Sequence, residues 1–80
     1  MDKILTLYTG PHCHLCDEAK ALLYPLLHGA GWQLREVDIS TDEQLQARYG
    51  TRIPVIVSPN GREKGWPFSP GQVRRLIGLS

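Results

Sequence analysis

The sequence has 80 residues, of which 41% are hydrophobic and 21% are charged, and its formal net charge is +1. This length predicts one globular domain over residues 1–80 and excludes a second. A charge near zero, with Lys and Arg scattered along the chain, gives no sign of nucleic-acid binding. No apolar run approaches the roughly 18 residues of a membrane span, and the N-terminus lacks the pattern of a signal peptide, so we expect a cytoplasmic protein.

The first part of the chain predicts a strand and a long helix. Residues 3–8 are a near-continuous apolar run, typical of a strand covered on both faces, and the Gly and Pro within 9–12 predict a loop. Apolar residues then recur at helical spacing, which predicts a helix that Gly29 and Gly31 end: Leu15, Ala19, Leu22, Leu23, Leu26 and Leu27. Because a proline inside a helix costs about 3 kcal/mol, we expect a kink or a last turn at Pro25.

The middle of the chain predicts a second strand and a short helix. The strand is expected over 32–39, and the helix runs through Tyr49 until Gly50 ends it. Ser40 is the expected N-cap of this helix, with Glu43 reaching back to complete a capping box.

The last third of the chain predicts a hairpin and a final helix. Residues 53–57 predict a third, buried strand, and the turn signal at 59–61 predicts that 62–66 return antiparallel as an exposed edge strand. The sequence Ser-Pro-Gly-Gln at 69–72 predicts a capping box with proline at the first helical position. We expect this helix to run to about Leu79, with three apolar residues facing inward: Val73, Leu76 and Ile77.

The order of these elements predicts an α/β fold. A strand–helix–strand crossover is right-handed and makes the first two strands parallel. The closing hairpin must then join the same sheet. We therefore expect a mixed four-stranded sheet with three helices on its faces, in the order βαβαββα.

The only two cysteines, Cys13 and Cys16, lie where the first strand ends and the first helix begins. A bridge between them would close too short a loop to stabilise the fold much. A helix N-terminus offers free N–H groups and a partial positive charge, so the pKa of the Cys13 thiol should be lowered. Cys16 falls near the inward stripe of the helix and should be less exposed. We expect Cys13 to attack a substrate disulfide and Cys16 to resolve the mixed disulfide.

Two histidines and two carboxylates surround this pair. His12 and His14 flank Cys13; if protonated they would favour its thiolate, and if neutral they could accept or return its proton. The alternative is two solvated histidines near a surface loop. Asp17 and Glu18 act in the opposite sense, because a carboxylate near a thiol opposes its ionisation. We therefore expect a moderate lowering of the Cys13 pKa.

A metal site is the competing interpretation of the cysteine pair. Cys13, Cys16 and His28 begin like a zinc finger, but no second histidine at finger spacing and no second cysteine pair follows. A bridging iron–sulfur cluster would need further ligands from a second chain or from glutathione. A cysteine pair without function is the remaining alternative, although its place between strand and helix favours redox chemistry. We expect no bound metal.

The segment 7–19, LYTGPHCHLCDEA, resembles the thioredoxin superfamily, as do Thr-Arg-Ile-Pro at 51–54 and the element order. More closely, the chain is similar to small bacterial glutaredoxin-like proteins, over residues 3–79. The resemblance implies a cis Ile53–Pro54 peptide bond, with Pro54 facing the cysteines and the backbone of Ile53 free to pair with an extended substrate. A trans proline that begins a strand is the alternative.

Glutaredoxins similar in length usually hold glutathione with a lysine and an aspartate, where this chain has Gly10 and the segment 65–68. We therefore expect no tightly bound cofactor, with glutathione as a candidate reductant only. The glutathione carboxylates could be received by Arg52, by Lys64 or by the start of the last helix at Ser69. Trp66 and Phe68 could form an apolar wall for a substrate, although core packing is the simpler explanation.

The sequence therefore predicts a thiol–disulfide oxidoreductase that acts as a monomer. Its expected substrate is a disulfide in a protein or a small molecule, and its expected donor is glutathione or a protein of thioredoxin-reductase type. The alternative is a thioredoxin-fold module that binds a partner protein with little or no turnover. The expected catalytic residues are Cys13 and Cys16, and the expected substrate-binding residues are His12, His14, Arg52, Ile53 and Pro54.

Overall fold

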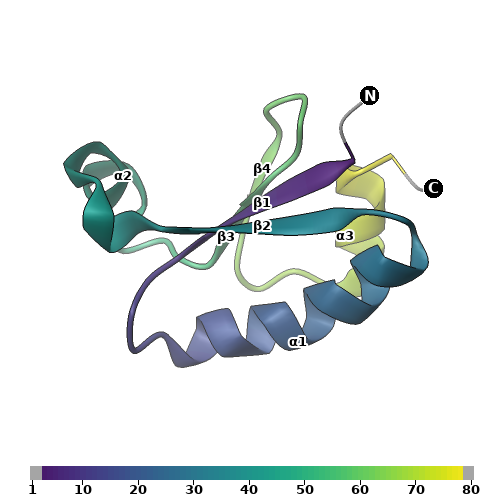
Figure 1. Cartoon of the computed structure of the whole chain (residues 1–80), viewed down its shortest axis with the longest axis horizontal. Coiled ribbons are helices and arrows are strands. Elements are labelled where there is room, and N and C mark those ends of the chain that lie inside the picture. Colours follow the sequence, from purple (N-terminus) through teal and green to yellow (C-terminus); the bar gives the residue numbers. More distant parts are fainter. Residues whose placement is uncertain (1–2, 79–80) are drawn as a thin grey trace.

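A computed structural model describes residues 3–78 of the chain. The helices and strands follow the predicted order, with one short 3-10 helix added (Figure 1). In chain order they are β1 (Ile4–Thr9), α1 (His14–Gly29), β2 (Gln33–Asp38), η1 (Ile39–Thr41), α2 (Glu43–Tyr49), β3 (Val55–Val57), β4 (Glu63–Gly65) and α3 (Pro70–Leu76).

The four strands form one mixed sheet in the order β2-β1-β3-β4. β1 and β2 are parallel, whereas β3 pairs antiparallel with both β1 and β4. The predicted sheet and its antiparallel edge strand are therefore confirmed. β3 is shorter than expected because Ile53 and Pro54 stay outside the ladder, to which a proline cannot donate a hydrogen bond.

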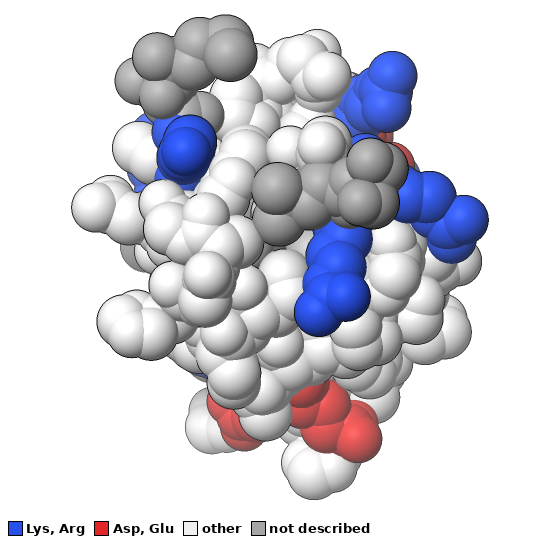
Figure 2. Space-filling view, turned by 90° about the vertical axis from the view of Figure 1, so that its right-hand side faces the viewer, with Lys and Arg blue, Asp and Glu red and all other residues white. Residues whose placement is uncertain are grey.

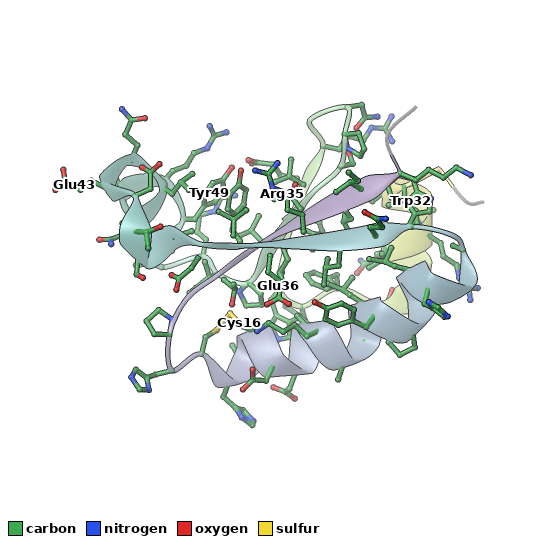
Figure 3. All side chains as sticks on the ribbon, in the orientation of Figure 1. Cys16, Trp32, Arg35, Glu36, Glu43 and Tyr49 are labelled. Carbon is green, nitrogen blue, oxygen red and sulfur yellow. A yellow bond between two sulfur atoms is a disulfide. The ribbon has the colours of Figure 1, made fainter. Side chains whose placement is uncertain are left out.

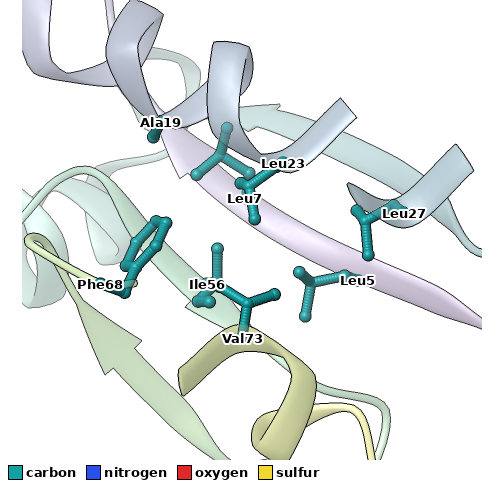
Figure 4. Packing of buried hydrophobic residues seen from close by; sticks show 8 residues of the cluster. All are labelled: Leu5, Leu7, Ala19, Leu23, Leu27, Ile56, Phe68 and Val73. Carbon is teal, nitrogen blue, oxygen red and sulfur yellow. The ribbon is translucent and has the colours of Figure 1, made fainter. Parts of the chain in front are cut away.

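Alternate residues of β1 point to the two faces of the sheet. On one face, Leu5 and Leu7 are fully buried against α1 and α3, in a cluster shown in Figure 4: Leu5, Leu7, Ala19, Leu23, Leu27, Ile56, Phe68 and Val73. On the other face, Tyr8 stacks on Tyr49 of α2 with the ring centroids 4.5 Å apart. The loop that carries the cysteines therefore leaves the end of a strand that is packed on both sides.

The long helix α1 differs from the prediction at its first turn. Leu15, which we placed on the inward stripe, is 44% exposed. The buried stripe follows Cys16 and the residues spaced three and four positions beyond it, and Leu15 lies about 100° around the helix from Cys16. Pro25 begins the last turn as expected, and the chain leaves the helix through Gly31, whose φ is 75°.

The start of α2 also differs from the prediction. Ser40 is not its N-cap but lies within η1, and Asp42 caps α2 instead. The Asp42 carboxylate accepts hydrogen bonds from the N–H groups two and three residues further on, at 2.9 and 3.2 Å. Asp and Ser are comparably good N-caps, so the cap sequence alone did not decide between the two positions.

The last helix confirms its predicted start. Ser69 and Gln72 form the capping box, and Pro70 is the first helical residue. Val73 is buried, and two further apolar residues, Leu76 and Ile77, are partly buried against the core. The helix ends at Leu76, three residues before the predicted end near Leu79, because Ile77 is its C-cap and Gly78 leaves the helix with a φ of 86°. Within residues 3–78, no helix has both the length and the apolar character needed to cross a membrane.

Candidate active site

Cys13 and Cys16 are joined by a disulfide at the N-terminus of α1, with their Cα atoms 5.2 Å apart. Cys13 is the N-cap residue, and its Sγ accepts a hydrogen bond from the backbone N–H of Cys16 at 3.1 Å. Cys13 is half-buried, whereas Cys16 is 1% exposed. The expected difference in exposure is therefore present.

The two histidines lie at the surface beside this disulfide. His12 is exposed and has a φ of 55°, in the left-handed region that few non-glycine residues adopt. His14 is 88% exposed, and its Nε2 lies 3.8 Å from the Glu18 carboxylate one turn along α1. Among the described residues, neither histidine bonds to a cysteine. This placement suits contacts with a bound substrate better than proton transfer inside the protein.

The segment before β3 lies against the cysteine loop. A Cβ placed on Gly10 would lie 2.9 Å from Cδ1 of Ile53, so the two segments approach each other closely at this point. The Ile53–Pro54 peptide bond is cis, and Pro54 is buried. The structure thus brings Ile53 and Pro54 to the loop that holds Cys13.

The backbone of Ile53 is only partly free, contrary to the expectation. Its N–H donates to the carbonyl of Tyr49 at 3.1 Å, because the C-terminal turn of α2 continues into this segment. The Pro54 carbonyl accepts a hydrogen bond from the N–H of Trp66 at 3.0 Å. Within the described part of the chain, the Ile53 carbonyl is the one backbone hydrogen-bonding group of these two residues that has no partner.

The model of the glutaredoxin-like domain family (DUF836) matches residues 4–78. The chain belongs to this family. An X-ray structure of a structural-genomics target protein from X. campestris is 37% identical to the chain, with a TM-score of 0.80 over 95% of this chain and 97% of that one. The solution structure of the same target is also 37% identical, with a TM-score of 0.78 over 95% and 94%. A structure described as that of a malarial protein shares the fold, at 20% identity and a TM-score of 0.68 over 92% and 91%. No curated protein matches the chain.

Arg52 of this glutaredoxin-like domain is held by Glu63 and Tyr49. Its guanidinium lies 3.7 Å from the Glu63 carboxylate and 5.4 Å from the centre of the Tyr49 ring. Glu63 also pairs with Arg48 at 3.2 Å and accepts the hydroxyl hydrogen bond of Tyr49. Burial, followed by this hydrogen bond, raises the pKa of Tyr49. Arg52 therefore joins α2 to β4, and no local sequence pattern pointed to Glu63 as its partner.

A second polar cluster lies between α1 and β2. The Glu36 carboxylate accepts a hydrogen bond from the Tyr24 hydroxyl and lies 3.0 Å from Nζ of Lys20. These two hydrogen bonds, led by that of Tyr24, lower the pKa of Glu36, and the same contact raises the pKa of Tyr24. Lys20 stands one helical turn after Cys16, and Figure 3 shows Glu36 above α1 on the same side of the sheet as Cys16. This cluster has no short-range signal in the sequence, because its partners lie 12 and 16 residues apart.

One pocket of the domain lies away from the disulfide. It has a volume of about 510 Å³ and lies at the opposite end of the sheet, where three cations help to line it: Lys3, Arg62 and Arg75. Figure 2 faces this end and shows Lys and Arg side chains around it. In residues 3–78, no three His, Cys, Asp or Glu side chains gather as potential metal ligands.

Proposed function

We propose that this glutaredoxin-like domain is a thiol–disulfide oxidoreductase that uses Cys13 as nucleophile and Cys16 as resolving thiol. The observation that carries the proposal is the asymmetry of the pair: Cys13 is half-buried at the N-cap, whereas Cys16 is buried behind it. The N–H of Cys16 already points at the Cys13 sulfur, and a backbone donor of this kind stabilises a thiolate.

The reaction starts from the dithiol form. The Cys13 thiolate attacks one sulfur of the substrate disulfide, that S–S bond breaks, and the leaving sulfur takes up a proton to become a thiol. Cys16 then loses its proton and attacks the Cys13 sulfur, which forms the Cys13–Cys16 disulfide and releases the second substrate thiol. Two electrons pass from the protein to the substrate, and an external thiol donor returns them.

The surroundings of Cys13 support a disulfide substrate that is recognised through few contacts. The Ile53 carbonyl beside Pro54 offers an acceptor to an extended peptide, and His12 and His14 border the same surface. Arg52 contributes through its position next to Ile53 rather than as a free cation. The proposed donor is glutathione or a protein of thioredoxin-reductase type, with no tightly bound cofactor, and the proposed compartment is the reducing cytoplasm.

Serine variants of the two cysteines test the assignment of roles. Cys13→Ser should abolish reduction of a small neutral disulfide, bis(2-hydroxyethyl) disulfide, whereas Cys16→Ser should accumulate a mixed disulfide on Cys13 that mass spectrometry detects. Ser58→Ala, a change far from the cysteines at the β3–β4 turn, serves as the control and should leave turnover unchanged. Equal turnover in both cysteine variants would contradict the proposal.

Leu15 favours a second candidate, a binding module with little turnover. Its side chain is 44% exposed between the two cysteines, which suits an apolar contact with a partner protein. Turnover assays with glutathione and with a thioredoxin-reductase-type donor separate the two candidates. Absence of turnover with both donors, together with retained binding of a partner, would favour the module.

A further inference from the structure

Thr9 is the last residue of β1 and carries a buried hydroxyl without a partner. The residue is 8% exposed, and among residues 3–78 its Oγ1 is the one buried side-chain oxygen or nitrogen that makes no hydrogen bond. Thr9 lies on the same face of the sheet as Leu5 and Leu7, because residues two apart in a strand point the same way. That face is the one that α1 covers.

The packing of α1 on β1 places Thr9 opposite the start of the helix. Figure 4 shows two pairs of side chains side by side along this interface: Leu5 with Leu27, and Leu7 with Leu23. Four helical residues rise about 6 Å, and two strand residues rise about 6.6 Å. Moving two residues forward along β1 therefore corresponds to moving four residues back along α1. The next step brings Thr9 to Ala19 and, just beyond it, to Cys16. The buried hydroxyl and the buried sulfur therefore belong to the same end of the interface.

Three charged side chains on the facing parts of α1 and β2 already have partners: Lys20, Glu36 and Asp38. Lys20 lies 3.0 Å from the Glu36 carboxylate and 4.0 Å from that of Asp17. The Asp38 carboxylate, on β2 beside Thr9, accepts the N–H of Ser40 at 2.8 Å. The Thr9 hydroxyl differs from these groups because it is buried on the face of the sheet that α1 covers and has no hydrogen-bond partner.

In the oxidised protein the hydroxyl makes no hydrogen bond, and the Cys16 sulfur is held in the disulfide with Cys13. Leaving a buried donor unsatisfied costs free energy. Reduction turns Cys16 into a thiol or thiolate, and a thiolate is a strong acceptor. We propose that in the dithiol form the Thr9 hydroxyl donates a hydrogen bond to the Cys16 sulfur, and that Thr9 is thereby a positioning residue for the resolving step. This inference rests on the proposed function of the Cys13–Cys16 pair.

The hydrogen bond changes no atom or electron balance in the reaction. Cys16 still gives up its own proton before it attacks Cys13, and the Thr9 proton stays on Thr9 throughout. Because the bond exists only in the reduced form, it stabilises the dithiol relative to the disulfide. Thr9 therefore raises the reduction potential of the couple and makes the domain a weaker reductant than it would be with an apolar residue at this position.

The test compares the reduction potentials of three variants, measured by equilibration with oxidised and reduced glutathione. Thr9→Val keeps the shape of the side chain and removes the hydroxyl, and it should shift the equilibrium about tenfold toward the disulfide, which is about 30 mV for a two-electron couple. Thr9→Ser keeps the hydroxyl and should stay close to the wild type. Thr6→Val, on the same strand but on its other face, is the matched control and should not change the potential.

A second measurement needs no variant. In the wild type, a slowly exchanging Thr9 hydroxyl proton should appear by NMR in the reduced form and be absent in the oxidised form. An unchanged potential in Thr9→Val, equal shifts in Thr9→Val and Thr9→Ser, or identical hydroxyl signals in both redox forms would each overturn the inference. The potential is an equilibrium property of the pair, so these results are independent of whether the domain turns over a substrate.

Discussion

Replacing Gly10 with alanine tests how closely the cysteine loop packs against the segment before β3. The new Cβ would lie 2.9 Å from Cδ1 of Ile53, roughly 1 Å inside ordinary contact. The δ-methyl ends a rotatable, half-buried side chain, so relieving the overlap costs about 0.5–1.5 kcal/mol in side-chain torsion. The φ of Gly10 is not positive, so alanine can adopt its backbone conformation. Alanine also lowers the conformational entropy of the unfolded chain, which stabilises the folded protein by about 0.4–1 kcal/mol. The net destabilisation expected for Gly10→Ala is therefore small, at most about 1 kcal/mol.

A double-mutant cycle with Ile53→Val isolates the contact itself. Valine lacks Cδ1, so Gly10→Ala should become neutral or stabilising in that background, with a coupling energy of about 1 kcal/mol. Urea denaturation of the oxidised protein measures the free energy of unfolding of all four proteins. Gly29→Ala is the control, because nothing lies within 4 Å of its new Cβ, and its effect should not depend on residue 53. An equal effect of Gly10→Ala in both backgrounds would refute the close approach of the two segments.

Three further variants test the electrostatics around the site. The hydrogen bond from Tyr24 lowers the pKa of Glu36, so the ionised Glu36 carboxylate stabilises the fold above the usual carboxyl pKa of 4.5 and this stabilisation is lost as the pH falls. The difference in unfolding free energy between wild type and Glu36→Gln should therefore shrink in acid. A difference that stays constant with pH would contradict this prediction. Arg52→Ala should lower stability by about 0.5–1 kcal/mol and leave the KM of an anionic disulfide unchanged; a raised KM would show that Arg52 binds the substrate. Asp17→Asn should lower the pKa of the Cys13 thiol slightly in a thiolate absorbance titration of the reduced protein, because an exposed carboxylate opposes ionisation only weakly. An unchanged titration would show that Asp17 does not act on Cys13.

Local signals in the sequence predicted the parts of the fold that are local in space. The capping box at Ser69 involves residues three apart, and the cysteine pair lies within one helical turn, so both are visible in a short window. The same reasoning chose Ser40 over Asp42 because two good caps stand two residues apart. Only the formation of η1, which takes up Ser40, decides between them.

The interactions that surround the site are non-local, so no short stretch of the sequence predicts them. Glu63 contacts Tyr49, Arg48 and Arg52, which lie 11 to 15 residues earlier in the chain. These contacts form only because the fold brings α2 and the residues after it next to β4. The spacing of these residues carries no periodic signal. The burial of Thr9 is similar, since a threonine at the end of a strand is commonplace until α1 closes over it.

The backbone of Ile53 and Pro54 sets a limit on how a substrate can be recognised. Ile53 has lost its N–H to Tyr49, proline has none to offer, and the Pro54 carbonyl is taken by Trp66, so one carbonyl is left for a peptide. A single hydrogen bond contributes about 0.5–1.5 kcal/mol, which is far too little to hold a peptide in place. In the proposed function the backbone therefore contributes little to binding, and a disulfide that reaches the half-buried Cys13 is held covalently once it reacts. If the domain is the proposed oxidoreductase, we expect accessibility of a disulfide, more than the sequence around it, to decide which disulfides it reduces.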